Sequence, residues 1–390
     1  MDRRIMIFTG KGGVGKTSVA ASHAVKSADE GVKTLLISTD MAHNLGDLFG
    51  VSTGREPYKI TDNLDIYEID ANYVMENDYA DITSCISKMM PGSEEVSAEE
   101  FGIMTGMEEL FSLLKIKQIY DEEKYKRIIV DCAPTGETLS LLKFPELLSW
   151  YMEKLFPIGK LALRVLSPVS KKLMKVELPN KKAMSDIEKL YEKLIDLQEL
   201  FKNRDVTSVR IVTIPEKMVV EETKRNYMYM NLYNYNVDGL YINRVLPHEL
   251  DNQFFSQWKE IQQKYIKEIK ESFGNLPMNE IPWYDEEMDS IEGLRRICRD
   301  ALSDNDIFEV KEILERESFE MVDDGYTLKV IIPGISKDEL DIYQSQTDVV
   351  IKVDNFKRNI PLPNILRKYI IDEANLENGQ LLLHFAQGDE

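Results

Sequence analysis

The sequence has few cysteines and no long apolar run. Its 390 residues include three cysteines, Cys85, Cys132 and Cys298, and none of them forms a CxxC pair. This excludes a disulfide framework and a zinc site of the usual spacing. No uncharged stretch of about 18 residues occurs, so we expect no transmembrane helix. The first residues lead directly into a strand pattern without a signal peptide, and we therefore expect a cytoplasmic protein.

Basic residues are fewer than acidic ones. The chain has 48 lysines and arginines against 68 aspartates and glutamates, which gives a formal net charge of −20. Because a protein that binds a phosphate backbone needs a basic surface, we expect no nucleic acid as the main partner. Residues 160–182 reverse this balance, with many basic residues and a single glutamate. That segment is either a solvated helix face or a contact for a membrane surface or a client's acidic flank.

A glycine-rich segment near the N-terminus has the spacing of a phosphate-binding loop. It matches the pattern G-x-x-x-x-G-K-[ST], in which backbone N–H groups surround phosphates, the lysine contacts the outer phosphates and the hydroxyl binds Mg²⁺. An apolar strand pattern precedes it and an Ala-rich helix pattern follows, whose N-terminus favours anions. We therefore predict that these residues bind nucleotide: Gly10, Lys11, Gly12, Gly13, Val14, Gly15, Lys16, Thr17 and Ser18.

The first half of the chain alternates strand patterns with helix patterns. This alternation predicts an α/β fold with a mostly parallel, doubly wound sheet of the P-loop NTPase type. The strand patterns cover residues 34–39, 127–130, 209–213 and 239–242. Loops at the carboxyl ends of such strands bind ligands, so the residues that follow these strands should face one crevice.

Two aspartates follow predicted strands and are candidates for the chemistry. Asp131 ends the second of these strand patterns, and its carboxylate can complete a Mg²⁺ site with Thr17. Asp40 ends the first, and we predict that it orients the attacking water and assists the metal. Together with the P-loop, these two carboxylates indicate a nucleotide hydrolase.

The remainder of the chain predicts a helical subdomain and a second domain. Helical inserts at about 73–119 and 144–201 interrupt the ATPase domain that we expect over 1–303. The methionines of the first insert either fill a core or line an adaptable hydrophobic groove. Beyond about residue 317 the apolar period changes to two, with turn residues between the runs. This pattern predicts a β-sandwich over 318–387.

Several motifs resemble one family, that of the arsenical pump-driving ATPases and the ATPases that target tail-anchored membrane proteins. Its signatures are matched by Lys11–Thr17, Ser38–Asp47 and Asp131–Leu139. Its adenine-side segments are matched by Tyr241–Pro247 and Ile281–Trp283. The segment after Arg316 resembles the small heat-shock (alpha-crystallin) domain, best at Ala374–Leu381.

The resemblance implies a deviant P-loop ATPase that binds ATP and Mg²⁺ and works as a homodimer. In such a dimer Lys11 crosses the interface to phosphate bound by the other subunit, which would explain the second lysine of the loop. Lys16 belongs to the loop's own cradle, and Asp40 positions the water. On the adenine side, Asn243 reads the base while Pro282 and Trp283 flank it.

The resemblance leaves more than one function open. We expect a homodimeric ATPase that opens and closes a hydrophobic groove for apolar client segments, as a targeting factor or chaperone. Its partner would be an apolar helical client or a membrane protein. The alternative is an ATPase subunit that energises an anion or metalloid efflux pump. Pump ATPases bind arsenite through several cysteines of their helical region, where this chain has only Cys85. Met41 and Glu137 replace the usual proline and histidine of the family motifs.

Overall fold

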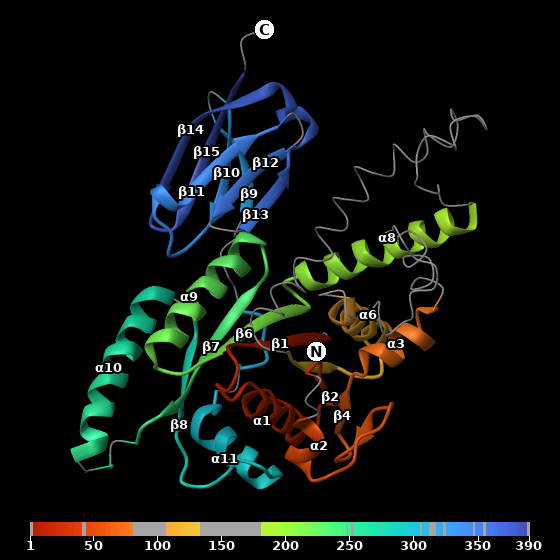
Figure 1. The fold of residues 1–390 in the computed structure, drawn as a ribbon, viewed down its shortest axis with the longest axis vertical. Helices are drawn as coiled ribbons and strands as arrows, with labels where there is room; N and C mark the ends of the chain where they lie inside the picture. Colours follow the sequence, from red (N-terminus) through yellow and green to blue (C-terminus); the bar gives the residue numbers. More distant parts are fainter. Residues whose placement is uncertain are drawn as a thin grey trace, which may run out of the picture. The chain divides into compact units, whose positions relative to one another are not determined.

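In the computed structural model, whose helices and strands are drawn in Figure 1, the chain forms two compact units. The first unit comprises Met1–Thr207 and Asp285–Ser303, and the second comprises Ser208–Tyr284 and Asp304–Glu390. The structure describes residues 3–40, 44–80, 107–132, 181–247, 249–250, 253–274, 276–304, 306–311, 317–322, 325–345, 348–353 and 356–387.

An eight-stranded sheet has the strand order β3-β4-β2-β5-β1-β6-β7-β8. Its strands in the first unit are β1 (Arg4–Thr9), β2 (Thr34–Ser38), β3 (Tyr58–Lys59), β4 (Leu64–Glu68) and β5 (Arg127–Asp131). Strands β4, β2, β5 and β1 pair in parallel, whereas β3 is an antiparallel edge strand. The four parallel strands are buried at every position, as expected for a parallel sheet that is covered on both faces. The predicted P-loop NTPase fold class is confirmed.

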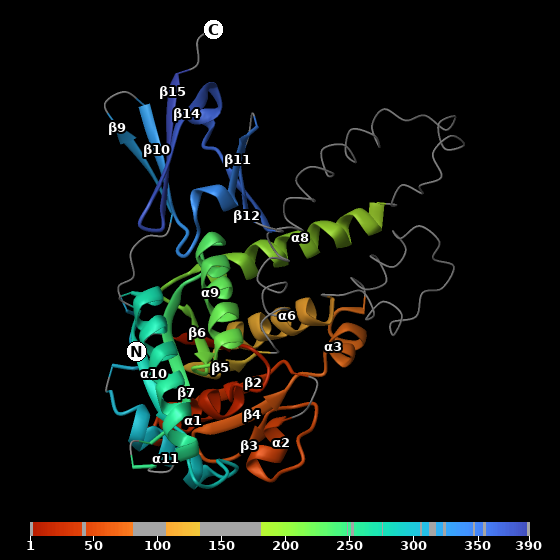
Figure 2. The same cartoon turned by 60° about the vertical axis from the view of Figure 1, so that its left-hand side comes forward.

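The helices of the first unit pack on this sheet and on one another. They are α1 (Lys16–Asp29), α2 (Asn44–Phe49), α3 (Ala71–Asn77), α6 (Met107–Asp121), α8 (Lys181–Lys202) and α11 (Ile291–Ala301). Helix α1 packs against β5 and α11, where Arg295 pairs with Asp29 at 2.8 Å. Helix α6 contacts both α3 and α8, and the three lie side by side in Figure 2. None of the helices within the described ranges is both long and apolar enough to span a membrane.

The predicted helical inserts are described only in part, because residues 81–106 and 133–180 lie outside the described residues. Of the methionines proposed for a groove, Met75 is fully buried, while Met89, Met90, Met104 and the side chain of Met107 lie outside what the structure describes. The neighbouring Leu110, Phe111, Leu113 and Leu114 are also buried. These side chains therefore form a core in the free chain and are not available as a groove.

The second unit contains the remaining strands and helices of the ATPase fold. These are β7 (Val237–Val245) and β8 (Met278–Pro282), with α9 (Lys217–Leu232) and α10 (Gln253–Phe273); β6 (Thr207–Thr213) starts at the boundary of the units. Strands β6, β7 and β8 pair in parallel. Ile269 and Phe273 of α10 pack on Leu240 and Ile242 of β7, together with Val220 of α9. This apolar contact fixes α10 along one face of β7.

The C-terminal part of the second unit is a β-sandwich. One sheet has the order β14-β15-β10-β9, formed by β9 (Glu317–Val322), β10 (Gly325–Ile331), β14 (Tyr369–Glu377) and β15 (Gln380–Gln387). The other contains β11 (Leu340–Gln344), β12 (Asp348–Val353) and β13 (Phe356–Pro361). All strand pairs are antiparallel. The apolar side chains between the sheets are buried, among them Leu328, Val349, Ile351, Leu383 and Phe385. The predicted all-β sandwich is confirmed as a fold class.

The β-sandwich is attached to the C-terminal end of α9. Arg358 of β13 is 4% exposed, donates to the Leu232 carbonyl and pairs with Glu317. The hydroxyl of Tyr233 donates to the Lys357 carbonyl at 3.0 Å. A guanidinium at a helix C-terminus satisfies a carbonyl that lacks a helical partner and meets the negative end of the helix dipole. The sandwich is thus joined to the ATPase fold by buried polar contacts as well as by the chain.

Candidate active site

The P-loop connects β1 to α1 and depends on two glycines. Gly13 and Gly15 have φ values of 79° and 89°, in the left-handed region where glycine is strongly favoured. A side chain at Gly13 would meet nothing within 4 Å, so the need there is conformational and not steric. Gly15 is the N-cap of α1 and supplies no side-chain cap, and the first turn has no acidic residue. The first N–H groups of α1 are therefore suited to an anion.

The Lys16 side chain bridges the two ends of this loop. It is 7% exposed, and its Nζ donates to the Lys11 carbonyl at 3.3 Å. The ammonium is thereby held within the turn whose backbone N–H groups would surround a phosphate. Lys11, by contrast, contributes its carbonyl to the turn and has a partly buried side chain. The two lysines of the motif therefore occupy different environments.

Thr17 and Asp131 form a pair at the end of β5. The Thr17 hydroxyl donates to the Asp131 carboxylate, which is 1% exposed. The Oδ1 atom of Asp131 has no hydrogen-bond partner within the part of the chain that the structure describes. Burial raises the pKa of Asp131 to about 6, and the nearby charge of Asp40 adds to this, against the lowering effects of Thr17 and Lys16. Such a carboxylate is destabilised in its charged form until a cation compensates it.

This pair fits the metal of a P-loop ATPase. Mg²⁺ prefers oxygen ligands and is usually bound by one or two carboxylates together with substrate phosphates and water. Among the described residues no cluster of three or more histidines, cysteines or acidic residues could hold a metal ion. Thr17 and the unpaired oxygen of Asp131 can therefore supply part of a coordination shell, and the phosphates of a nucleotide would supply the rest.

Asp40 lies at the same edge of the sheet. Its backbone N–H donates to Ser38 Oγ at 3.2 Å, and the N–H of Thr39 donates to the Asp131 carbonyl at 3.1 Å. Its charge contributes to the raised pKa of Asp131, so the two carboxylates are electrostatically coupled. The structure thus brings Lys16, Thr17, Asp40 and Asp131 together, as the strand-end argument predicts. Met41 lies outside the described residues.

We expect the nucleotide-free Asp131→Asn protein to be more stable than the wild type at pH 8. A carboxyl whose pKa is raised from 3.8 to about 6 contributes stability at low pH, and this contribution is lost as the pH rises through 6. Above that pH the ionised group costs on the order of 3 kcal/mol, which the amide avoids. Urea unfolding at pH 4, 6 and 8 measures the difference, which should shrink towards low pH.

The matched control for this comparison is Asp121→Asn, because Asp121 is exposed at the end of α6. That variant should differ little from the wild type at each pH. Adding Mg²⁺ and ATP should stabilise the wild type more than Asp131→Asn, since only the wild type keeps the proposed metal ligand. An Asp131→Asn protein that is less stable at pH 8 without nucleotide would contradict the raised pKa.

The residues that we predict to contact adenine lie at the carboxyl ends of β7 and β8 in the second unit. Val245 pairs with Pro282, and the Trp283 N–H donates to the Val245 carbonyl at 2.8 Å. The pairing shifts register between Ile242 and Val245, and the Asn243 Oδ1 accepts from the Arg244 N–H at 2.9 Å. The Trp283 side chain is 52% exposed, which leaves part of the indole surface available for stacking. The structure thus gathers all three predicted residues at one place.

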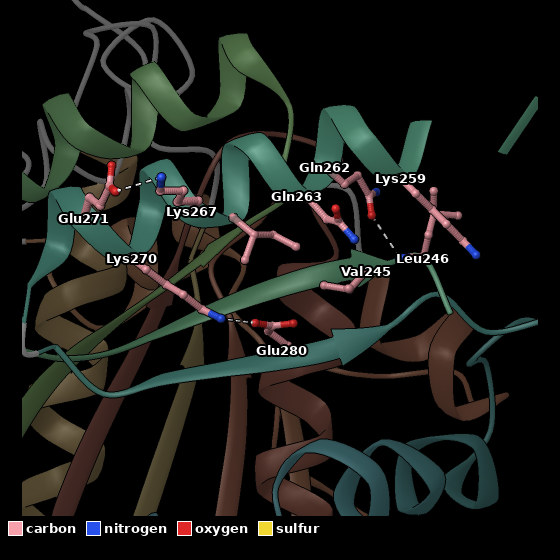
Figure 3. A pocket seen from close by; sticks show the side chains of 10 residues that line it. Val245, Leu246, Lys259, Gln262, Gln263, Lys267, Lys270, Glu271 and Glu280 are labelled. Atoms are coloured by element: carbon pink, nitrogen blue, oxygen red, sulfur yellow. Dashed lines mark hydrogen bonds and ion pairs between the residues drawn. The ribbon is translucent and has the colours of Figure 1, made fainter. Parts of the chain in front are cut away.

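A groove of about 470 Å³ lies beside this strand end, between α10 and strands β7 and β8 (Figure 3). Gln262 of α10 accepts from the Leu246 N–H at 2.9 Å and donates to the Arg244 carbonyl at 3.0 Å. It therefore holds the backbone that follows Asn243. Gln262 could not be predicted from the sequence, since a glutamine in an amphipathic helix gives no signal of such a contact.

Comparison with known proteins extends these observations. Residues 3–303 match the family described as anion-transporting ATPase, and residues 323–385 match an HSP20-like domain found in ArsA. A proposed arsenical pump-driving ATPase of Aquifex aeolicus is 34% identical over 395 residues, which cover 97% of this chain and 99% of the relative. A proposed arsenical pump-driving ATPase of Chlorobaculum tepidum is 35% identical over 365 residues, with 92% and 90% covered.

A further relative is the protein named ATPase GET3 of Kluyveromyces lactis. It is 32% identical over 324 residues, which cover 76% of this chain and 88% of the relative. The resemblance inferred from the motifs is thereby confirmed. Because the family match spans most of the chain and includes the P-loop, Thr17 and Asp131, this protein belongs to the anion-transporting ATPase family and is an ATP hydrolase with a C-terminal HSP20-like domain.

Proposed function

We propose that this protein is a homodimeric, Mg²⁺-dependent ATPase whose nucleotide state opens and closes a hydrophobic groove for apolar client segments. Its role would be that of a membrane-protein targeting factor or a chaperone in the cytoplasm. The observation that carries the proposal is the attachment of the β-sandwich to α9 through Arg358. A sandwich of the heat-shock type is held directly on a helix of the ATPase fold. Similarity to ATPase GET3 supports the same proposed function.

In this proposal the P-loop residues bind ATP and Lys16 neutralises its outer phosphates. Thr17 and Asp131, assisted by Asp40, would hold Mg²⁺, which would supply charge compensation to the phosphates. Asp40 orients the attacking water, and Lys11 of one subunit contacts phosphate bound by the other. Asn243 contacts the adenine, while Pro282 and Trp283 flank it. We assign these roles to an ATPase domain over 1–303 and the sandwich to 318–387.

The client site of this proposal is carried by the second helical insert. The buried positions of Met75, Leu110 and Phe111 exclude them from an open groove in the free chain. The apolar residues of the second insert, Leu147, Trp150, Met152, Leu155 and Phe156, lie outside the described residues, as does most of the basic segment 160–182. Apolar side chains of this kind accept a helix, and the basic segment suits the acidic flank of a client or anionic lipid headgroups.

We expect a peptide that resembles a transmembrane helix to crosslink more strongly with an ATP analogue than without nucleotide. The reason is that closure of the dimer would align the inserts of both subunits into one groove. Photocrosslinking of a labelled apolar peptide to the full chain in the two states measures this, and a scrambled polar peptide of equal length is the control. Equal and negligible crosslinking in both states would reject the client-binding proposal.

The alternative function is the energising subunit of an anion or metalloid pump, which the names of the two bacterial relatives favour. Among the described cysteines, burial raises the pKa of Cys132 to about 12 and that of Cys298 to about 11. Neither thiol readily supplies the thiolate that a soft metalloid requires. Measuring the rate of ATP hydrolysis with and without arsenite distinguishes the two functions, and we expect no appreciable stimulation. Stimulation that disappears in Cys85→Ser would favour the pump, through Cys85 residues of two subunits.

A further inference from the structure

Glu68, the last residue of β4, is a buried carboxylate that the proposed reaction does not use. It is 4% exposed. Its Oε1 accepts from the N–H groups of Leu45 at 2.8 Å and Gly46 at 3.2 Å, and its Oε2 accepts from the Thr53 hydroxyl. Hydrogen bonds to an ionised acceptor are stronger than neutral ones, and burial strengthens them further. Glu68 therefore holds in place the chain segment that carries Leu45, Gly46 and Thr53.

That segment is the continuation of the chain from Asp40. Leu45 and Gly46 are in the first turn of α2, a few residues beyond Asp40. The near end of the segment is held separately, because the Asp40 N–H donates to Ser38 Oγ. Ser38 and Glu68 are paired neighbours on β2 and β4, and the Ile69 N–H donates to the Ser38 carbonyl at 3.0 Å. Asp40 on one side and Leu45 and Gly46 on the other are thus held at adjacent strand ends of the sheet, while residues 41–43 between them lie outside the described residues.

Close packing supports the anchoring role. A Cβ added at Gly46 would lie 2.9 Å from the Val51 carbonyl oxygen, nearer than real Cβ contacts come, and 3.7 Å from both Glu68 Oε2 and Thr53 Oγ. The Val51 N–H also donates to the Gly46 carbonyl at 2.9 Å. The start of α2 therefore packs closely against the loop that carries Thr53, and the Glu68 carboxylate accepts hydrogen bonds from both.

We propose that Glu68 is a positioning residue for ATP hydrolysis: by holding Leu45 and Gly46 it limits where Asp40, shortly before them in the chain, can lie at the sheet edge. This inference rests on the proposed role of Asp40. Without Glu68 the P-loop and the Thr17–Asp131 pair remain intact, so ATP still binds. The hydrogen bond from the Asp40 N–H to Ser38 Oγ remains, but the restraint through Leu45 and Gly46 is lost. The Asp40 carboxylate is then placed less accurately, and a small misplacement of a reacting group is costly in rate.

The test compares three variants in the full chain with Mg²⁺ and ATP. Glu68→Ala removes the hydrogen bonds from Leu45, Gly46 and Thr53, Glu68→Gln keeps an oxygen for the two N–H groups, and Thr53→Val removes only the hydroxyl. We expect Glu68→Ala to lower the single-turnover hydrolysis rate by about 10–100-fold, the range found for residues that orient a catalytic group through another. Its Kd for ATP should change less than about twofold, and Glu68→Gln should recover much of the rate, with Thr53→Val close to the wild type.

Backbone amide exchange of Leu45 and Gly46 gives a readout that does not depend on catalysis. It should accelerate in Glu68→Ala, while the exchange of β1 and α1 remains unchanged. Faster exchange with an unchanged hydrolysis rate would overturn the proposal, and so would a parallel loss of ATP affinity with exchange increased throughout the chain. If Glu68→Ala does not fold, the same measurements are made on Glu68→Gln. A loss of ATP affinity in Glu68→Gln that equals its loss of hydrolysis rate would overturn the proposal.

The double variant Glu68→Ala with Asp40→Asn separates this inference from the proposed function. If Glu68 acts through Asp40, the double variant should be no slower than Asp40→Asn alone, because the group being positioned has already lost its function. Additive losses would mean that Glu68 acts elsewhere. If Asp40→Asn alone hydrolyses ATP at the wild-type rate, the proposed role of Asp40 fails, and accelerated exchange at Leu45 and Gly46 still shows whether Glu68 anchors the segment.

Discussion

We expect Lys16→Ala to abolish ATP binding, and Lys11→Ala to leave binding largely intact while removing turnover. Lys16 is buried inside the P-loop, where its Nζ is 3.3 Å from the Lys11 carbonyl. Its loss removes a positive charge from the phosphate cradle and a hydrogen bond that closes the turn. Charge-assisted hydrogen bonds of this kind contribute about 1.5–3 kcal/mol each, so we expect the Kd for ATP to rise by about 100-fold or more.

Lys11 should behave differently because its carbonyl, which the Lys11→Ala change keeps, is the group that accepts from Lys16 Nζ in the turn. If its ammonium reaches phosphate in the partner subunit, it acts on the charge that develops in the transition state. Cations supplied across an interface in this way contribute about 10³–10⁵-fold to the rate of phosphoryl transfer. Isothermal titration with an ATP analogue and single-turnover hydrolysis separate the two effects. Lys26→Ala is the matched control, since Lys26 lies on α1 and pairs with Glu30 at 3.3 Å.

Mixing the two inactive variants tests whether Lys11 acts across the interface. In a mixed dimer the Lys11→Ala subunit still binds ATP and receives Lys11 from the Lys16→Ala subunit. Random mixing should therefore restore about a quarter of the wild-type rate, because half of the dimers are mixed and each has one complete site. If Lys11 acts within its own subunit, no mixed dimer contains a complete site. A mixture that stays inactive, although mixed dimers form, would contradict the role across the interface.

The sequence predicts the ATPase fold well where strands are apolar throughout. Residues 34–39 and 127–130 correspond to β2 and β5, and residues 209–213 fall within β6. Buried parallel strands are recognisable because both of their faces need apolar side chains. Strand β8 was missed as a strand since Asn279 and Glu280 interrupt its short apolar pattern. Strand β14 was missed for a similar reason, because the exposed polar residues Asp372, Glu373, Asn375 and Glu377 interrupt its apolar pattern.

For the candidate site too, residues within short sequence motifs could be predicted, whereas residues whose partners are distant in the chain could not. The P-loop and the strand-end positions of Asp40 and Asp131 follow from short patterns, and the structure gathers them at one sheet edge. Glu68 and Arg358 could not be assigned, because their partners are 22 and 126 residues away in the chain at Gly46 and Leu232. Such contacts depend on how strands and helices pack, which no local pattern records. The apolar pattern around Leu110 likewise could not separate a core from a groove.

We expect Asp40→Asn to bind ATP and to accumulate as a closed, nucleotide-bound dimer that hydrolyses very slowly. The amide keeps the size of the side chain, and the hydrogen bond from the residue 40 N–H to Ser38 Oγ does not involve the replaced group. What disappears is the negative charge expected to orient and deprotonate water. Loss of such a group costs about 10²–10⁴-fold in rate. Single-turnover quench measurements and light scattering with Mg²⁺ and ATP follow the rate and the dimer.

The electrostatic coupling of the two aspartates makes the Asp40→Asn result specific. The charge of Asp40 is one of the causes that raise the pKa of Asp131, so its removal lowers the pKa of Asp131 and favours the ionised, metal-binding form. A slow Asp40→Asn protein therefore cannot be explained by a weakened carboxylate at Asp131. The control is Asp62→Asn, whose carboxylate lies in an exposed pair with Lys59 and should leave the rate unchanged. Hydrolysis at the wild-type rate by Asp40→Asn would assign the water-orienting role to another residue.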